Sequence, residues 1–371
     1  MSEIGDLGEL ARRARQLAPG SGTGTGSELE RIGTAGTQGG VEPSAPTGPD
    51  RGPVPRIGLV LSGGGAKGAY HVGVLEYLAS VGTRLHAIAG ASIGALNGAV
   101  IAGSDSLDAA AAHLAEVWDE VGRLGPAGSL SREDRDENTL EQLARLPSRL
   151  THPAVSPQHL ERLVAEHVDP GRLRTGTPIW VSAFPAMEGV DPLNRWGWAV
   201  DVVRSRLGAS VEWLHLNGLS DHDCRQAVLA SAALPLILPP RRLNGRLYRD
   251  GGLADNTPAG ALVRHAGCDI VIVVHLSRGS TWDAHDFPGT SMIEIRPRRP
   301  LAPAGPGGDM TGMLDFSPHR LRRLRAQGRA DTAAILDPLA ETLHSVTALR
   351  SAEAAMLAAL AGLDGLDGLD E

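Results

Sequence analysis

A serine framed by two glycines is the first residue whose setting suggests chemistry. Gly90-Ala91-Ser92-Ile93-Gly94 fits the pattern GxSxG and lies between a predicted strand at 85–89 and a predicted helix. In this context the pattern presents a serine hydroxyl as a nucleophile, because small residues such as Gly90 and Gly94 permit the sharp turn. The helix that follows directs its first amide groups at negative charge that develops near Ser92. The alternative is a chance serine at the start of a glycine-rich helix.

A glycine-rich turn, Gly63-Gly64-Gly65-Ala66-Lys67-Gly68, follows the first predicted strand and matches GxGxxG. A dinucleotide site requires an acidic residue about 20 positions further on, but no Asp or Glu lies between Glu76 and Asp105. A Walker loop requires Ser or Thr after the lysine, where this chain has Gly68. The backbone amides can instead form an oxyanion hole. The alternatives are a tight strand–helix turn and a nucleotide-binding module that uses the loop for phosphate.

A carboxylate is the third group of interest. Asp250-Gly251-Gly252 follows an apolar stretch, so we expect Asp250 in a loop near the sheet edge. An ordinary turn aspartate is the alternative. A conventional triad would place serine, acid and histidine in that chain order, which makes His275, at the end of the predicted strand 269–275, the rival base.

Together the three motifs resemble those of the patatin-like phospholipases. The resemblance rests on their order and on SAALPLILPP ahead of Asp250, covers roughly 55–277, and continues at 313–331. It implies an α/β/α sandwich and acyl-ester hydrolysis without histidine, metal or cofactor. The substrates it implies are esters of phospholipids, lysophospholipids or acylglycerols. The N-terminal tail and residues 107–167 depart from the pattern.

The resemblance also assigns roles to residues. It makes Ser92 the nucleophile and Asp250 the base of a catalytic dyad. The motif glycines Gly90, Gly94, Gly251 and Gly252 would support these two side chains. Lys67 stands where family members carry Arg or Lys, and the oxyanion hole would be formed around Gly63, Gly64, Gly65, Lys67 and Gly68.

The elements that must position these groups alternate along the chain. An apolar β-branched run begins at Arg56, and Tyr70, Val74, Leu78 and Val81 then recur at helical spacing. A second strand, a glycine-framed turn and another helix follow, and strand patterns return at 178–184, 197–203 and 269–275. This alternation predicts a three-layer α/β/α sandwich with a mostly parallel sheet.

The chain divides into three parts by composition. Residues 1–53 are rich in Gly, Pro, Ser and Thr and are predicted to be a disordered tail. The hydrolase domain is expected over 54–295, with a helical insertion at about 107–167. Residues 296–371 are expected to form a loop to 312 and then helices packed on the domain, with a frayed end. Trp196 and Trp198 flank a predicted strand and could line an acyl pocket, although ordinary packing is the alternative.

Composition narrows the function classes. The 371 residues carry 43 acidic and 35 basic side chains, a net charge of −8 that argues against nucleic acid as the main partner. Two separated cysteines argue against a disulfide framework and a cysteine-rich zinc site. No apolar run reaches the ~20 residues of a membrane span, and the N-terminus lacks a secretory signal pattern. We therefore expect a cytoplasmic protein, of an oligomeric state that the sequence does not indicate.

A local excess of arginine stands against this acidic background. Between Arg296 and Arg329 there are eight arginines and only two acids, Asp309 and Asp315. Such a segment could dock transiently on an anionic membrane surface. The alternative is a solvated helix face whose arginines pair with acids elsewhere in the fold.

Overall fold

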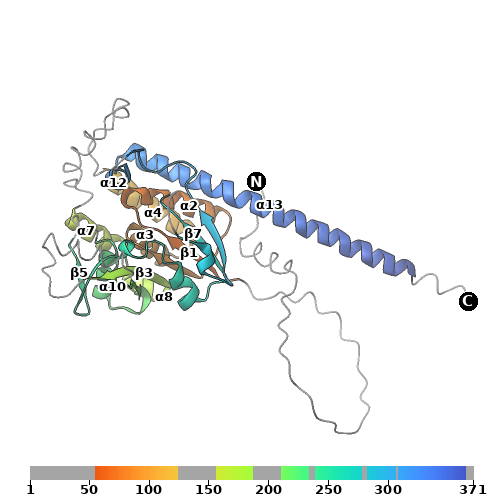
Figure 1. The fold of residues 1–371 in the computed structure, drawn as a ribbon, viewed down its shortest axis with the longest axis horizontal. Helices are drawn as coiled ribbons and strands as arrows, with labels where there is room; N and C mark the ends of the chain where they lie inside the picture. The colour runs from red at the N-terminus through yellow and green to blue at the C-terminus, as the bar shows by residue number, and fades with distance from the viewer. Residues whose placement is uncertain are drawn as a thin grey trace, which may run out of the picture.

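A mixed, mostly parallel β-sheet forms the centre of the fold (Figure 1). The computed structural model describes residues 55–123, 156–186, 210–233, 239–277, 282–305 and 308–364. The sheet order is β5-β6-β3-β2-β1-β7-β8, and β4 also pairs with β3. The strands are β1 (Ile57–Leu61), β2 (Ala87–Gly90), β3 (Ile179–Pro185), β4 (Glu212–His215), β5 (Arg241–Leu243), β6 (Arg246–Asp250), β7 (Ile270–Val274) and β8 (Ser291–Ile295).

The central strands are parallel, and one edge is antiparallel. β1 pairs in parallel with both β2 and β7, which brings the carboxyl ends of these strands to one edge of the sheet. β6 runs antiparallel to β3 in the register Ala183↔Asp250. The loops after β1 and β2 and the end of β6 therefore meet in one region. The predicted mostly parallel sheet is confirmed.

Alternate residues of β1 serve two apolar layers. Leu59 and Leu61 face the larger core cluster, whereas Val60 belongs to the cluster on the other face. The first face is covered by α2 (Ala69–Ser80), α3 (Ile93–Ala102), α4 (Leu107–Arg123) and α10 (Asp221–Ser231). The second carries the short helical segments α11 (Ala259–Ala261) and η6 (Leu262–Ala266). The fold is thus a three-layer sandwich with unequal helical layers.

Two parts of the expected helical insertion are described. α4 packs against α2 and α3, so it belongs to the main helical layer of the domain. α7 (Pro157–His167) begins at Ser156, whose hydroxyl accepts a hydrogen bond from the His159 amide, and α8 (Pro170–Thr175) follows it. The interval 124–155 lies outside the described residues. So do the expected tail at 1–53, the strand pattern at 197–203, and Trp196 and Trp198.

The C-terminal region is helical. α12 (Gly308–Leu314) forms where the sequence predicted a loop up to residue 312, so that prediction was wrong for this stretch. α13 (Pro318–Asp364) packs on α2 through its first half and continues past the domain (Figure 1). Its residues Leu321, Leu324 and Leu336 are buried, whereas Leu339 and Met356 further along are exposed. No helix in the described ranges is both long and apolar enough to cross a membrane.

Candidate active site

Ser92 sits on a strained turn between β2 and α3. Its backbone adopts φ 54° and ψ −123°, a left-handed region that non-glycine residues rarely occupy. A Cβ atom on Gly94 would collide with the carbonyl group of Leu61, so only glycine fits against the end of β1. The Ser92 amide donates a hydrogen bond of 3.0 Å to Ser231 Oγ on α10. The turn is therefore held both by close packing and by a side chain 139 residues away in sequence.

The glycine-rich turn lies directly beside Ser92. A Cβ atom on Gly63 would lie 2.9 Å from Ser92 Cβ. The Gly63 amide donates to Asn256 Oδ1 at 3.0 Å, and Asn256 Nδ2 donates to the Gly63 carbonyl at 3.4 Å. The amides of Gly64 and Gly65, by contrast, have no acceptor within the described residues. These two amides of the glycine turn are therefore free to donate to another group.

Asp250 is the last residue of β6, at the start of the 3-10 turn Gly251–Leu253, and not in the loop that the sequence suggested. Only 1% of its surface is exposed, and Oδ1 accepts a hydrogen bond of 2.7 Å from the Gly252 amide. Burial raises the pKa of Asp250 from 3.8 to about 7, while hydrogen bonding from Ser92 and Gly252 acts in the opposite direction. The carboxyl group is therefore poised to exchange a proton near neutral pH.

The contact between Asp250 and Ser92 is loose. The Ser92 hydroxyl is near enough to lower the pKa of Asp250, yet Asp250 Oδ2 has no fully formed hydrogen bond within the described residues. The hydroxyl contact is thus longer or more bent than an ordinary hydrogen bond. Catalytic hydrogen bonds commonly have this character in a free enzyme and tighten when substrate binds.

A buried polar network supports the glycine turn from behind. Asn97 Nδ2 on α3 donates to the Gly68 carbonyl at 3.2 Å and lies 3.2 Å from His71 Nδ1 on α2. Trp118 Nε1 on α4 donates to Asn97 Oδ1 at 3.1 Å. Burial lowers the pKa of His71 to about 3, so its ring stays neutral. One amide side chain therefore ties three helices to the end of the glycine turn.

The side chain of Lys67 forms an ion pair with α12. Its ammonium group lies 3.3 Å from Asp309 Oδ1 on α12, and the Lys67 side chain is almost fully buried. The Lys67 amide is also occupied, because it donates to the Gly64 carbonyl at 3.2 Å. A Cβ atom on Gly65 would collide with the Met313 carbonyl group of α12. The short helix α12 therefore packs directly on the glycine turn.

His275 directly follows β7, which is separated from β2 by β1. Its Nε2 atom lies 3.0 Å from Glu294 Oε2, and its ring is tilted against that of Trp282. Burial, followed by the charge of Arg296, lowers the pKa of His275 to about 4. The structure thus places His275 with a carboxylate on β8, and its recorded partners do not include Ser92.

One group of side chains away from Ser92 has the donor types of a metal site. Glu120, Glu166 and His167 bring their ligand atoms within 4.8 Å of one another between α4 and α7. Arg162 approaches both carboxylates, at 3.7 Å from Glu120 and 4.0 Å from Glu166. Arg162 therefore offsets part of the negative charge of the two carboxylates, and its pairing with Glu120 joins α7 to α4.

The arginines of the C-terminal segment divide into paired and exposed groups. Arg320 is buried and donates to the carbonyl groups of Asp315 and Leu301 at 2.7 and 2.6 Å, and Arg325 pairs with Glu76.

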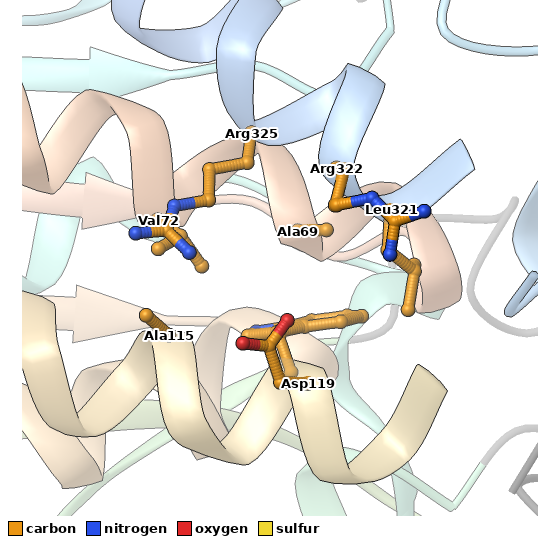
Figure 2. A pocket seen from close by; sticks show the side chains of 8 residues that line it. Ala69, Val72, Ala115, Asp119, Leu321, Arg322 and Arg325 are labelled. Carbon is orange, nitrogen blue, oxygen red and sulfur yellow. The ribbon is translucent and has the colours of Figure 1, made fainter. Parts of the chain in front are cut away.

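Arg322 and Arg325 reach over a small pocket between α2, α4 and α13, opposite Asp119 (Figure 2). Apolar side chains, including Ala69, Val72, Ala115, Trp118 and Leu321, form its walls.

Sequence reasoning found the main groups but missed their partners. Ser92, Asp250 and the glycine turn are brought together, whereas His275 is not. Ser231 and Asn256, which hold the Ser92 and Gly63 amides, were not singled out. Ser231 is the first residue of the SAALPLILPP segment quoted for the resemblance, whereas Asn256 lies outside the quoted motifs.

The sequence matches one protein family and several of its known members. The family model for patatin-like phospholipases matches residues 59–263. An uncharacterized NTE family protein of Mycobacterium tuberculosis is 30% identical over 233 residues, which cover 62% of this chain and 52% of that protein. Lysophospholipase NTE1 of Cryptococcus neoformans is 28% identical over 222 residues, 59% of this chain and 11% of that protein. The chain therefore spans about half of the one relative and a tenth of the other.

Similar solved structures are more remote. VipD from Legionella pneumophila aligns with a TM-score of 0.40 at 15% identity, covering 77% of this chain and 67% of that one. Human GIVD cytosolic phospholipase A2 aligns with a TM-score of 0.38 at 14% identity, covering 78% and 60%. The family model alone covers more than half of the sequence. The chain belongs to the patatin-like phospholipase family.

Proposed function

We propose that this protein is a lipid acyl hydrolase that cleaves fatty-acyl esters through a dyad of Ser92 and Asp250. The observation that carries the proposal is the convergence of Ser92, the glycine turn and the buried Asp250 carboxyl group, whose pKa is raised by burial to about 7. A general base is most effective when its pKa is close to the working pH. An ordinary aspartate, with a pKa near 3.8, would be a poor base for a serine hydroxyl.

The proposed reaction proceeds through an acyl-enzyme. Asp250 accepts the Ser92 proton while Oγ attacks the ester carbonyl, and the Gly64 and Gly65 amides donate to the resulting oxyanion. The amino end of α3 adds positive potential at the same place. The protonated Asp250 then gives its proton to the departing alcohol. A water molecule, deprotonated by Asp250, attacks the acyl-enzyme, and Asp250 returns this proton to Ser92 Oγ as the bond to the acyl group breaks and the fatty acid is released.

The oxyanion donors in this proposal are fewer than the sequence suggested. Asn256 already occupies the Gly63 amide, and the Gly64 carbonyl occupies that of Lys67. These two hydrogen bonds, together with the Lys67–Asp309 ion pair, occupy groups that would otherwise bind a phosphate, so they argue against a phosphate-binding loop. No observation therefore favours the nucleotide-binding alternative, and the burial of His275 beside Glu294 argues against a triad.

We base the proposed substrate class on the family. The family is that of the patatin-like phospholipases, and the fungal relative is a lysophospholipase. We propose phospholipid, lysophospholipid or acylglycerol esters as substrates and a cytoplasmic enzyme that contacts the membrane surface transiently. Arg322 and Arg323, which are exposed and have no recorded ion pair within the described residues, are the basic side chains suited to that contact.

The nucleophile can be tested directly. Ser92→Ala should abolish hydrolysis of a short acyl ester and prevent labelling by a fluorophosphonate, because both require the hydroxyl group. The variant should fold, since the Ser92 amide still donates to Ser231. Labelling that persists in Ser92→Ala would place the reactive serine elsewhere and would refute the dyad.

A further inference from the structure

We infer that Asn256 is a positioning residue that fixes the glycine turn against the Asp250 loop. The inference rests on the proposed function and concerns the geometry of the same site. Asn256 lies 193 residues from Gly63 in sequence, yet its amide side chain bonds both backbone groups of that residue. Oδ1 accepts from the Gly63 amide at 3.0 Å, and Nδ2 lies 3.4 Å from the Gly63 carbonyl oxygen. A neutral amide is suited to this contact because it offers a donor and an acceptor together.

Asn256 also lies beside the turn that follows Asp250. A Cβ atom on Gly252 would lie 2.7 Å from Asn256 Oδ1 and 2.9 Å from Asp250 Oδ1. The two side chains therefore converge on one glycine, whose amide donates to Asp250. On its other side Asn256 holds Gly63, which is packed against Ser92. The amide is thus a bridge between the backbone that carries the base and the backbone beside the nucleophile.

This bridge determines which amides face the oxyanion. Because the Gly63 amide is bound to Asn256, it is not available to an oxyanion. The amides of Gly64 and Gly65 remain available. Without Asn256, the Gly63 amide would lose its acceptor, and the turn could rotate so that it competes with Gly64 and Gly65. Displacement of reacting groups by about 1 Å costs about 100-fold in rate, and loss of one oxyanion donor costs about 100- to 1000-fold.

The chain offers a matched control in Asn217. Its side chain likewise clamps the backbone: Oδ1 accepts from the Ile179 amide at 2.8 Å, and Nδ2 donates to the Leu173 and Thr177 carbonyl groups. This contact lies at the amino end of β3, away from the edge that carries Ser92. Removal of either amide should lower stability, but only Asn256 should affect catalysis.

The experiment compares Asn256→Ala, Asn217→Ala and wild type on a short soluble ester, with thermal unfolding measured for each. We expect Asn256→Ala to lower kcat about 10- to 100-fold with KM nearly unchanged. Asn217→Ala should keep the wild-type kcat. A wild-type kcat in Asn256→Ala, or equal losses of kcat in the two variants, would overturn the inference.

A second variant, Asn256→Asp, tests the inference even if Asn256→Ala fails to fold. Asn256→Asp keeps the size of the side chain and an acceptor for the Gly63 amide, but it adds a carboxylate near Asp250. We expect the acid limb of its kcat/KM profile to move upward by about one pH unit, because a like charge disfavours ionised Asp250. A wild-type profile with wild-type kcat would contradict the role. If wild-type protein itself shows no ester hydrolysis and no fluorophosphonate labelling, the proposed function fails instead.

Discussion

Asp250→Asn should inactivate the protein and at the same time stabilise it above neutral pH. Burial places the pKa of Asp250 at about 7 in the folded state, against an ordinary 3.8. Because the folded-state value is raised, the protonated carboxyl favours folding, and this stability is lost as pH rises from about 4 through 7. At 1.36 kcal/mol per pKa unit, ionised Asp250 costs the folded state about 4 kcal/mol above pH 7. Asparagine keeps the shape and removes the charge.

Urea unfolding at a series of pH values measures this cost. The free energy of unfolding of Asp250→Asn, relative to wild type, should increase between pH 4 and 7 and then level off. Activity on a soluble ester should be lost at every pH, since asparagine cannot accept the Ser92 proton. A difference between Asp250→Asn and wild type that does not change with pH would show that Asp250 is an ordinary ionised side chain and refute the reasoning.

Three further outcomes can be measured with single or paired variants. His275→Ala, if folded by circular dichroism, should keep most of its esterase activity, because its side chain pairs with β8; a loss as complete as in Asp250→Asn would restore the triad. Arg320→Gln should lower the unfolding free energy by about 1–3 kcal/mol in urea titrations, since two buried carbonyl groups lose a charged donor. Arg322→Gln with Arg323→Gln should leave stability and soluble-ester activity unchanged but weaken sedimentation with anionic vesicles by about 2 kcal/mol at low salt; equal sedimentation would exclude this surface.

Local sequence patterns were sufficient for the parts of the site that are close together in the chain. The turn at Ser92 follows from glycines two residues away on either side, because the steric requirement is local. The layered fold likewise follows from apolar strand patterns that alternate with helical ones. By contrast, Ser231 and Asn256 act through hydrogen bonds that span 139 and 193 residues. Such pairings depend on the final packing of the sheet and leave no mark in local composition.

In the C-terminal segment, local propensity predicted the wrong element because tertiary contacts decide the structure there. Gly308, Gly312 and the surrounding prolines favour a loop by local propensity. The helix α12 forms there because the fold provides contacts for it: the Met313 carbonyl lies against Gly65, and Asp309 pairs with Lys67. Tertiary packing therefore outweighs propensity over these seven residues.

Burial gives a physical reason for an aspartate, and not a histidine, as the base of the proposed dyad. Histidines near the glycine turn and the ends of the central strands would ordinarily titrate near pH 6.5, but burial disfavours a cationic ring. It lowers the pKa of His71 to about 3 and that of His275 to about 4, so neither accepts a proton readily at neutral pH. Burial instead raises the pKa of an acid, and it raises that of Asp250 to about 7. In a dry site, therefore, a carboxylate gains basic strength while an imidazole loses it, which favours a dyad without histidine.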